Sequence, residues 1–129
     1  MSADKVAEAF RILGVHTARR QQLAEALLQV GGPWTLPQLA LSTGISRQKI
    51  YAVTEPLRDL DVLQPTRPIE PRDWRIIYPP KILSKKRREY GVTGATRYVF
   101  NPKRLREALQ VKAYEAQQQI LSVLQEATT

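Results

Sequence analysis

The most regular hydrophobic pattern of the chain lies between residues 36 and 63. Apolar residues at 36, 39 and 40 predict a short helix that ends at Gly44, because glycine adopts the left-handed conformation at low cost. A second helix is expected after Ser46, whose hydroxyl can accept a hydrogen bond from an amide of the first turn. Its predicted buried face recurs at three- and four-residue spacing: Ile50, Val53, Leu57 and Leu60. A strand is expected to follow from Val62.

Polar and basic residues open the second predicted helix, away from its buried face. Arginine can form two hydrogen bonds with guanine, and glutamine can form two with adenine. The amide end of a helix also favours phosphate. We therefore expect four residues to read bases in a DNA major groove: Arg47, Gln48, Lys49 and Tyr51. Three hydroxyl-bearing residues around the turn are expected to hold phosphates: Thr35, Thr43 and Ser46.

This segment resembles the winged helix-turn-helix of small prokaryotic regulators, the broad group that contains the MarR-, PadR- and ArsR-like proteins. The residues that carry the resemblance are Leu39-Ala40, Thr43-Gly44-Ile45-Ser46, Ile50-Tyr51 and the run 57–63. The resemblance covers residues 17–101, is strong only in 36–63, and implies a DNA-binding fold without a particular operator.

Two positions depart from the pattern of that group. Asp61 stands where many relatives have glycine before the first wing strand, and aspartate tolerates the left-handed region better than most residues. Pro56 lies inside the second helix, where proline removes one hydrogen bond. We therefore expect this helix to kink there, or to end near Glu55.

Two helices are expected before this segment. The first covers residues 3–13, with Val6, Phe10 and Leu13 on one face. The second begins after Thr17 and ends at Val30, before Gly31-Gly32-Pro33, with an apolar stripe at residues 23, 27 and 30. Thr35 is expected to cap the next helix, with Pro37 in its first turn, and Trp34 to pack the helices together.

Beyond Leu63 the pattern becomes that of strands. Residues 62–66 and 96–101 predict the two strands of a wing, and residues 73–78 predict a third that Pro79-Pro80 stops. The roughly thirty residues between the outer strands are too many for a structureless loop, so the expected wing is enlarged. Its flexible tip carries four consecutive cations: Lys85, Lys86, Arg87 and Arg88. Together with Arg97 they are expected to contact DNA, the alternative being a solvated loop.

Charge is unevenly distributed along the chain. Lys and Arg total 20 against 12 Asp and Glu, a net charge of +8. Residues 67–106 contain twelve of these cations and three acids, so this segment carries +9 and the remainder −1. A positive field confined to one third of the chain favours a nucleic-acid partner.

Residues 102–127 predict one long helix. Its apolar stripe has nearly heptad spacing: Leu105, Leu109, Ala113, Ala116, Ile120 and Val123. Such a stripe must be buried against something, and we expect the partner to be a second copy of the chain. The alternative is a helix packed across its own domain. A two-fold dimer would present two reading helices to two half-sites of DNA.

Other functional classes find little support in the sequence. The chain has no cysteine and one histidine, His16, and its carboxylates show no metal-ligand spacing, so we expect no catalytic site, metal or cofactor. The absence of a long apolar run and of a secretory pattern predicts a cytoplasmic, nucleoid-associated protein without a membrane partner. Nothing identifies a small-molecule effector.

The expected architecture is a single domain, mainly α with a small β-wing (α+β). It comprises an N-terminal helix (1–14), a winged helix-turn-helix with an enlarged basic wing (15–101) and a dimerisation helix (102–127). The expected function is sequence-specific binding of double-stranded DNA by a homodimeric transcriptional repressor. One alternative is a plasmid or phage partition or replication-control protein that binds repeated sites. Another is a protein- or RNA-interaction module without sequence readout.

Overall fold

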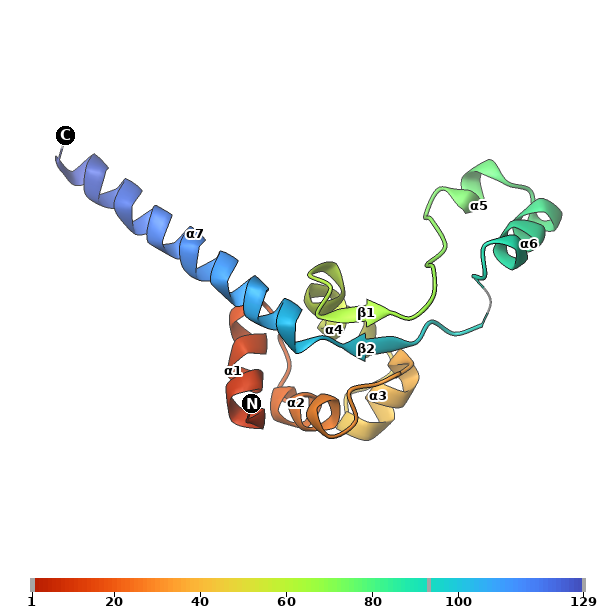
Figure 1. Cartoon of the computed structure of the whole chain (residues 1–129), viewed down its shortest axis with the longest axis horizontal. Helices are drawn as coiled ribbons and strands as arrows, with labels where there is room; N and C mark the ends of the chain where they lie inside the picture. The colour runs from red at the N-terminus through yellow and green to blue at the C-terminus, as the bar shows by residue number, and fades with distance from the viewer. Residues whose placement is uncertain (1, 93, 129) are drawn as a thin grey trace.

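The computed structural model describes residues 2–92 and 94–128. Its helices are α1 (Ala3–Ile12), α2 (Arg20–Gln29), α3 (Leu36–Thr43), α4 (Ile50–Asp59), α5 (Trp74–Ile77), α6 (Pro80–Glu89) and α7 (Pro102–Thr128). Strands β1 (Leu63–Pro65) and β2 (Tyr98–Phe100) form a small antiparallel sheet, so the protein is mainly helical. Two arms extend from a body made of α1–α4 and the sheet (Figure 1). One is α7, and the other, residues 66–97 with α5 and α6, is called the basic arm.

One apolar core holds the body together. Val6, Phe10 and Leu13 of the first helical segment are buried in it, as their spacing predicts. The ring of Phe10 meets that of Phe100 edge to face, with the centroids 6.3 Å apart, and so joins α1 to β2. Two details of the second helix differ from expectation. It begins at Arg20 instead of directly after Thr17, and Val30 is exposed beyond its last turn.

Local sequence signals set the ends of α3 and α4. Thr35 and Gln38 form a reciprocal capping box at the start of α3, and Gly44 ends that helix with a φ of +77°. The hydroxyl of Ser46 accepts a hydrogen bond from the Lys49 amide at 3.2 Å, but residues 47–49 form a turn and α4 begins only at Ile50. The prediction that the helix starts directly after Ser46 is therefore wrong. Asp61 adopts a left-handed φ of +58°. The predictions for Thr35, Gly44 and Asp61 are confirmed because each depends on a few neighbouring residues.

The second half of α4 differs from expectation. The helix continues through Pro56 to Asp59, so the predicted alternative of an end near Glu55 is wrong. Full burial of Leu57 stabilises the second half of α4 against the loss of the hydrogen bond that proline removes. Leu60, expected on the buried face, is 39% exposed.

Strand β2 is paired along both edges. On one edge it pairs with β1, with Leu63 opposite Phe100 and Pro65 opposite Tyr98. On the other edge, Trp34 and Tyr98 exchange two backbone hydrogen bonds of 2.7 Å, and the Phe100 amide donates to the Gly31 carbonyl. The Trp34 indole donates to the Val30 carbonyl at 2.6 Å. Trp34 therefore has the structural role expected of it.

The basic arm is helical where strands and a loop were expected. Residues 73–78 were predicted as a third strand, but Trp74–Ile77 form the one-turn helix α5. Residues 85–88 were predicted as a flexible loop, but they lie in α6. Proline explains both errors. Pro79-Pro80 ends the preceding segment, and Pro80, with its fixed φ, also begins a helix at the position where proline is favoured.

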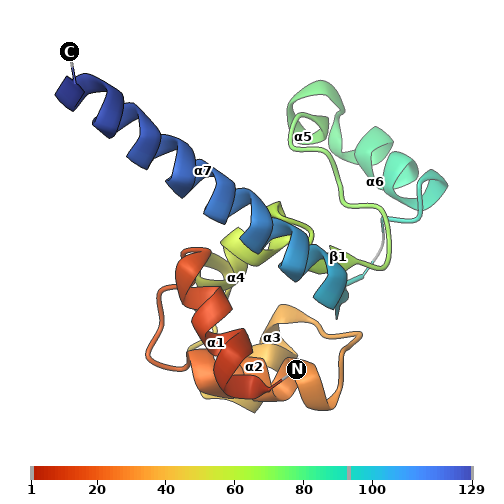
Figure 2. The same cartoon turned by 60° about the vertical axis from the view of Figure 1, so that its left-hand side comes forward.

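The apolar stripe of α7 has two different environments. Leu105 is 1% exposed in the core of its own body, and Leu109 packs against that core. The prediction of Leu105 as a dimerisation residue is therefore wrong, because its own chain covers it, whereas Leu109 is only partly buried. From residue 110 to residue 126 every side chain is exposed, including Ala113, Ala116 and the residues at 120 and 123. Figures 1 and 2 both show this part of α7 projecting away from the body.

The close approach of Gly32 to β2 gives a test of the double pairing. A Cβ atom at Gly32 would lie 2.6 Å from the Tyr98 carbonyl oxygen, at a φ of +127°. We expect Gly32→Ala to lower the free energy of unfolding by about 2–4 kcal/mol. Gly91 is the matched control, with φ of +71° and no atom within 4 Å, and Gly91→Ala should cost about 1 kcal/mol. Denaturant unfolding measures the free energy of unfolding of both variants. An equal loss of stability in the two would contradict the close approach of Gly32 to the Tyr98 carbonyl.

Candidate nucleic-acid interface

The predicted base-reading residues lie together on the surface at the start of α4. Arg47, Gln48 and Lys49 form the turn that leads into the helix, and all three side chains are exposed. Tyr51, in the first turn of α4, is 58% exposed. A groove of about 540 Å³ separates this turn from α3 and is lined by Gln38, Leu41, Arg47 and their neighbours. The arrangement presents basic and amide side chains beside the positive end of a helix.

Arg58 orients Tyr51, a contact that sequence reasoning missed. Its guanidinium lies over the Tyr51 ring, 4.1 Å from the centroid, and donates to the Tyr51 carbonyl at 2.6 Å. The same side chain reaches β2. Burial raises the pKa of the Tyr98 hydroxyl, and the positive charge of Arg58 partly opposes that rise. The available signal was the seven-residue spacing of Tyr51 and Arg58, which places them on one side of a helix.

The three predicted hydroxyls have different environments. Ser46 is exposed, and Thr35 is partly exposed. Each oxygen accepts a backbone hydrogen bond, which leaves its hydrogen free to donate to a phosphate. Thr43 is 2% exposed, donates to the Leu39 carbonyl at 2.6 Å and accepts from the Ile45 amide at 3.3 Å. The prediction of Thr43 as a phosphate contact is therefore wrong, because the hydroxyl is buried and already paired.

Two of the four consecutive cations hold the tip of the basic arm together. Arg87 donates to both carboxylate oxygens of Glu70, at 2.5 and 3.2 Å, and Arg75 lies 3.6 Å from the same group. Hydrogen bonding to Arg87 is the main cause that lowers the pKa of Glu70. Lys86 lies over the rings of Tyr78 and Tyr90, at 5.6 and 5.9 Å.

Aromatic contacts complete this small cluster. The Trp74 ring meets Tyr78 and Tyr90 edge to face, with centroid distances of 6.1 and 5.4 Å. Trp74 and Tyr78 come from the α5 segment, and Tyr90 follows α6 directly, so the rings join the two helices. The polar and aromatic contacts together account for a helical tip in a segment that has only one buried apolar side chain, Leu83.

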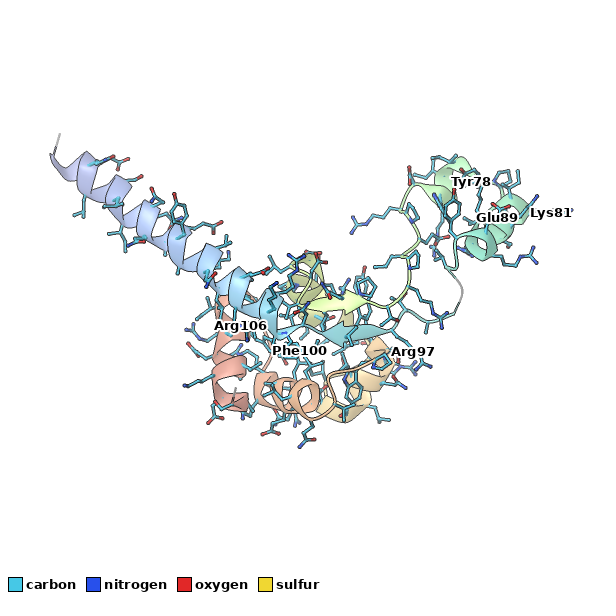
Figure 3. All side chains as sticks on the ribbon, viewed as in Figure 1. Tyr78, Lys81, Glu89, Arg97, Phe100 and Arg106 are labelled. Carbon is cyan, nitrogen blue, oxygen red and sulfur yellow. The ribbon has the colours of Figure 1, made fainter. Side chains whose placement is uncertain are left out.

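Exposed cations of the basic arm lie both at its tip and where it joins the body. At the tip of the arm, Lys85 and Arg88 are exposed, and Figure 3 shows Lys81 on the same hairpin. Arg97 is exposed at the end of β2, where the arm joins the body (Figure 3). Figures 1 and 2 both show α6 well apart from α4. The structure therefore does not bring residues 85–88 and 47–51 into one cluster.

Other kinds of site are not found in the described part of the chain. Residues 2–92 and 94–128 contain no group of three or more metal-ligating side chains, and none of their helices is long and apolar enough to cross a membrane. Comparisons with protein-family models, curated proteins and solved structures found no match to this chain. The interpretation of the site therefore depends on its own geometry and charge.

The ion pair of Glu70 predicts how the arm responds to acid. Because hydrogen bonding to Arg87 lowers the pKa of Glu70, the pair persists to a lower pH than the charge of an unpaired glutamate, and it is lost as the pH falls through the lowered pKa. On acidification, we expect the NMR resonance of the Trp74 indole N–H to shift in that pH range, at a higher pH than the resonance of the Trp34 indole. In Glu70→Gln, which lacks the charge, this early shift should be absent. Simultaneous shifts of both indoles in the wild type would contradict a separate ionic tip.

Proposed function

We propose that the protein binds double-stranded DNA in a sequence-specific manner, as a winged helix-turn-helix transcriptional regulator that acts as a repressor. The observation that carries this proposal is the exposed group at the start of α4: Arg47, Gln48, Lys49 and Tyr51. The group follows a capped helix and a glycine turn, which is the arrangement that places a helix in the major groove.

Each residue of the group has a chemical role in the proposed complex. Arg47 donates two hydrogen bonds to a guanine, and Gln48 exchanges two with an adenine. Lys49 and Tyr51 contact base edges beside them, and the hydroxyls of Ser46 and Thr35 hold phosphates, which fix the register of α4 on the duplex. Arg58 keeps Tyr51 in place before DNA arrives, so less side-chain freedom is lost on binding.

The basic arm acts as an enlarged wing in this proposal. Arg97 contacts phosphate beside α4, while Lys85 and Arg88 contact phosphates farther along the duplex. These contacts raise affinity without reading sequence. Because the arm carries its exposed cations well apart from α4, it extends the footprint beyond one half-site (Figure 2). The second candidate function, favoured by this extended footprint, is that of a partition or replication-control protein that binds repeated sites.

Base reading by Arg47 can be separated from general attraction to DNA. We expect Arg47→Ala to weaken binding to the preferred site by about 1–3 kcal/mol and to change binding to unrelated DNA much less. Arg106→Ala removes the same charge from an exposed side chain at the start of α7 (Figure 3) and should affect both affinities little. Titrations with preferred and scrambled duplexes measure these affinities. Equal losses on both duplexes would favour an interaction module without sequence readout.

Loss of cations at the arm tip is expected to change the salt dependence of DNA binding. Replacing Lys85 and Arg88 together by alanine should weaken binding to all duplexes and reduce the slope of log affinity against log salt by about 2, one for each phosphate that is no longer bound. Lys103→Ala with Arg106→Ala is the control of equal net charge, since both side chains are exposed on α7. A salt series measures the slopes. If the control lowers the slope as much, the arm tip does not contact phosphate.

A further inference from the structure

The distal part of α7 exposes many large apolar side chains. Between residues 110 and 126, six are about half exposed or more: Val111, Tyr114, Ile120, Leu121, Val123 and Leu124. Isolated helices are marginal in water, and helices in proteins are stabilised mainly by packing of one face. Figure 2 shows no other element of the chain alongside this part of α7. Something outside the chain must therefore cover it.

We propose that this part of α7 pairs with the same part of a second copy in antiparallel orientation, an inference that deepens the homodimer expected of the DNA-binding function. The contact is made by the distal stripe, which consists of Ala113, Ala116, Ile120 and Val123. Of the other large apolar residues, Leu124 flanks the stripe, and Val111, Tyr114 and Leu121 lie on other faces of the helix. Its spacing of three, four and three residues is that of the core positions of a coiled coil. The stripe continues the line of Leu109, which is already packed against its own body.

The sizes of the side chains favour the antiparallel orientation. In that orientation Ala113 lies opposite Val123 of the second copy, and Ala116 lies opposite Ile120. Every layer then combines one small and one large residue, so the distance between the helix axes stays constant. A parallel pair would stack alanine on alanine at residues 113 and 116, and large on large at 120 and 123. Close packing throughout would then be lost.

The charges beside the stripe favour the same orientation. Lys112 and Glu126 flank it on one side, two heptads apart. The antiparallel register that matches the layers brings Lys112 of each copy opposite Glu126 of the other. In a parallel pair Lys112 would face Gln117. Within its own chain Lys112 lies 3.9 Å from Glu115, an exposed pair that contributes little and is easily exchanged.

The proposed pairing has a consequence for DNA recognition. Its midpoint lies at residue 118, thirteen residues from Leu105, where α7 enters the body. At 1.5 Å per residue, the two copies of Leu105 lie about 39 Å apart along the helix pair. This is close to the spacing of successive half-sites on one face of DNA, about 34–36 Å. The antiparallel pair therefore separates the roots of α7 in the two bodies by a distance of that order.

Orientation can be measured directly because the chain has no cysteine. Gln110→Cys and Gln117→Cys place spin labels on the same face of α7, both at exposed positions. In the antiparallel pair the axial offset between labels is about 3 Å at residue 117 and about 24 Å at residue 110. Pulsed electron paramagnetic resonance without DNA should show a clearly longer distance for residue 110. Equal distances would establish a parallel pair, and absence of dipolar coupling a monomer; either result overturns the proposal.

A matched pair of variants tests which face of α7 forms the contact between the two copies. Ile120 belongs to the stripe and Leu121 does not, although both are exposed and neither supports the fold of the monomer. We expect Ile120→Gln to raise the dissociation constant of the dimer by about a hundredfold, since two buried isoleucines are lost per dimer. Leu121→Gln should change it little. Sedimentation without DNA measures both, and equal effects would overturn the assignment.

The pairing of α7 can be tested separately from the DNA-binding proposal. A monomeric chain that still prefers one DNA sequence would overturn only the pairing of α7. A dimer with the expected label distances but no sequence preference would overturn only the proposed function.

Discussion

The structure depends on the pairing of β2 along both edges. The backbone of Tyr98 bonds to Trp34 on one side and lies opposite Pro65 of β1 on the other, four residues before the start of α7. The segment before α3, the root of the basic arm and the root of α7 are therefore fixed by a single short strand. Gly32 permits this arrangement, because no larger residue fits against the Tyr98 carbonyl. The relative placement of the α4 surface and the two arms follows from this one constraint.

The sequence predicted what local signals determine and failed where tertiary context decides. The cap at Thr35, the turn at Gly44 and the left-handed Asp61 each depend on a few adjacent residues, and all are found. Residues 74–77 form a helical turn despite the apolar run, and the Trp74 ring packs against Tyr78 and Tyr90, contacts that the sequence pattern does not show. Periodicity located the stripe of α7 but not its partner, since Leu105 is covered by its own core and Ile120 by nothing in the chain.

The candidate site shows the same limits. Sequence order placed Arg47, Gln48, Lys49 and Tyr51 on an exposed surface, although the first three lie in the turn before α4, and it could not show that Thr43 is buried. A run of four cations was predicted as one contact surface. The structure divides it, because Arg87 neutralises Glu70 and Lys86 lies on two aromatic rings, while Lys85 and Arg88 remain exposed. Total charge therefore overstates how much of the arm is available to a polyanion.

The central claim is that the chain reads a DNA sequence. Selection of random duplex DNA by the full-length protein, with sequencing of the bound fraction at moderate salt, tests it most directly. The account predicts strong enrichment of one motif in two copies, with centres about one helical turn apart. Retention of DNA without an enriched motif would contradict it, and would show that the exposed residues at the start of α4 do not read bases.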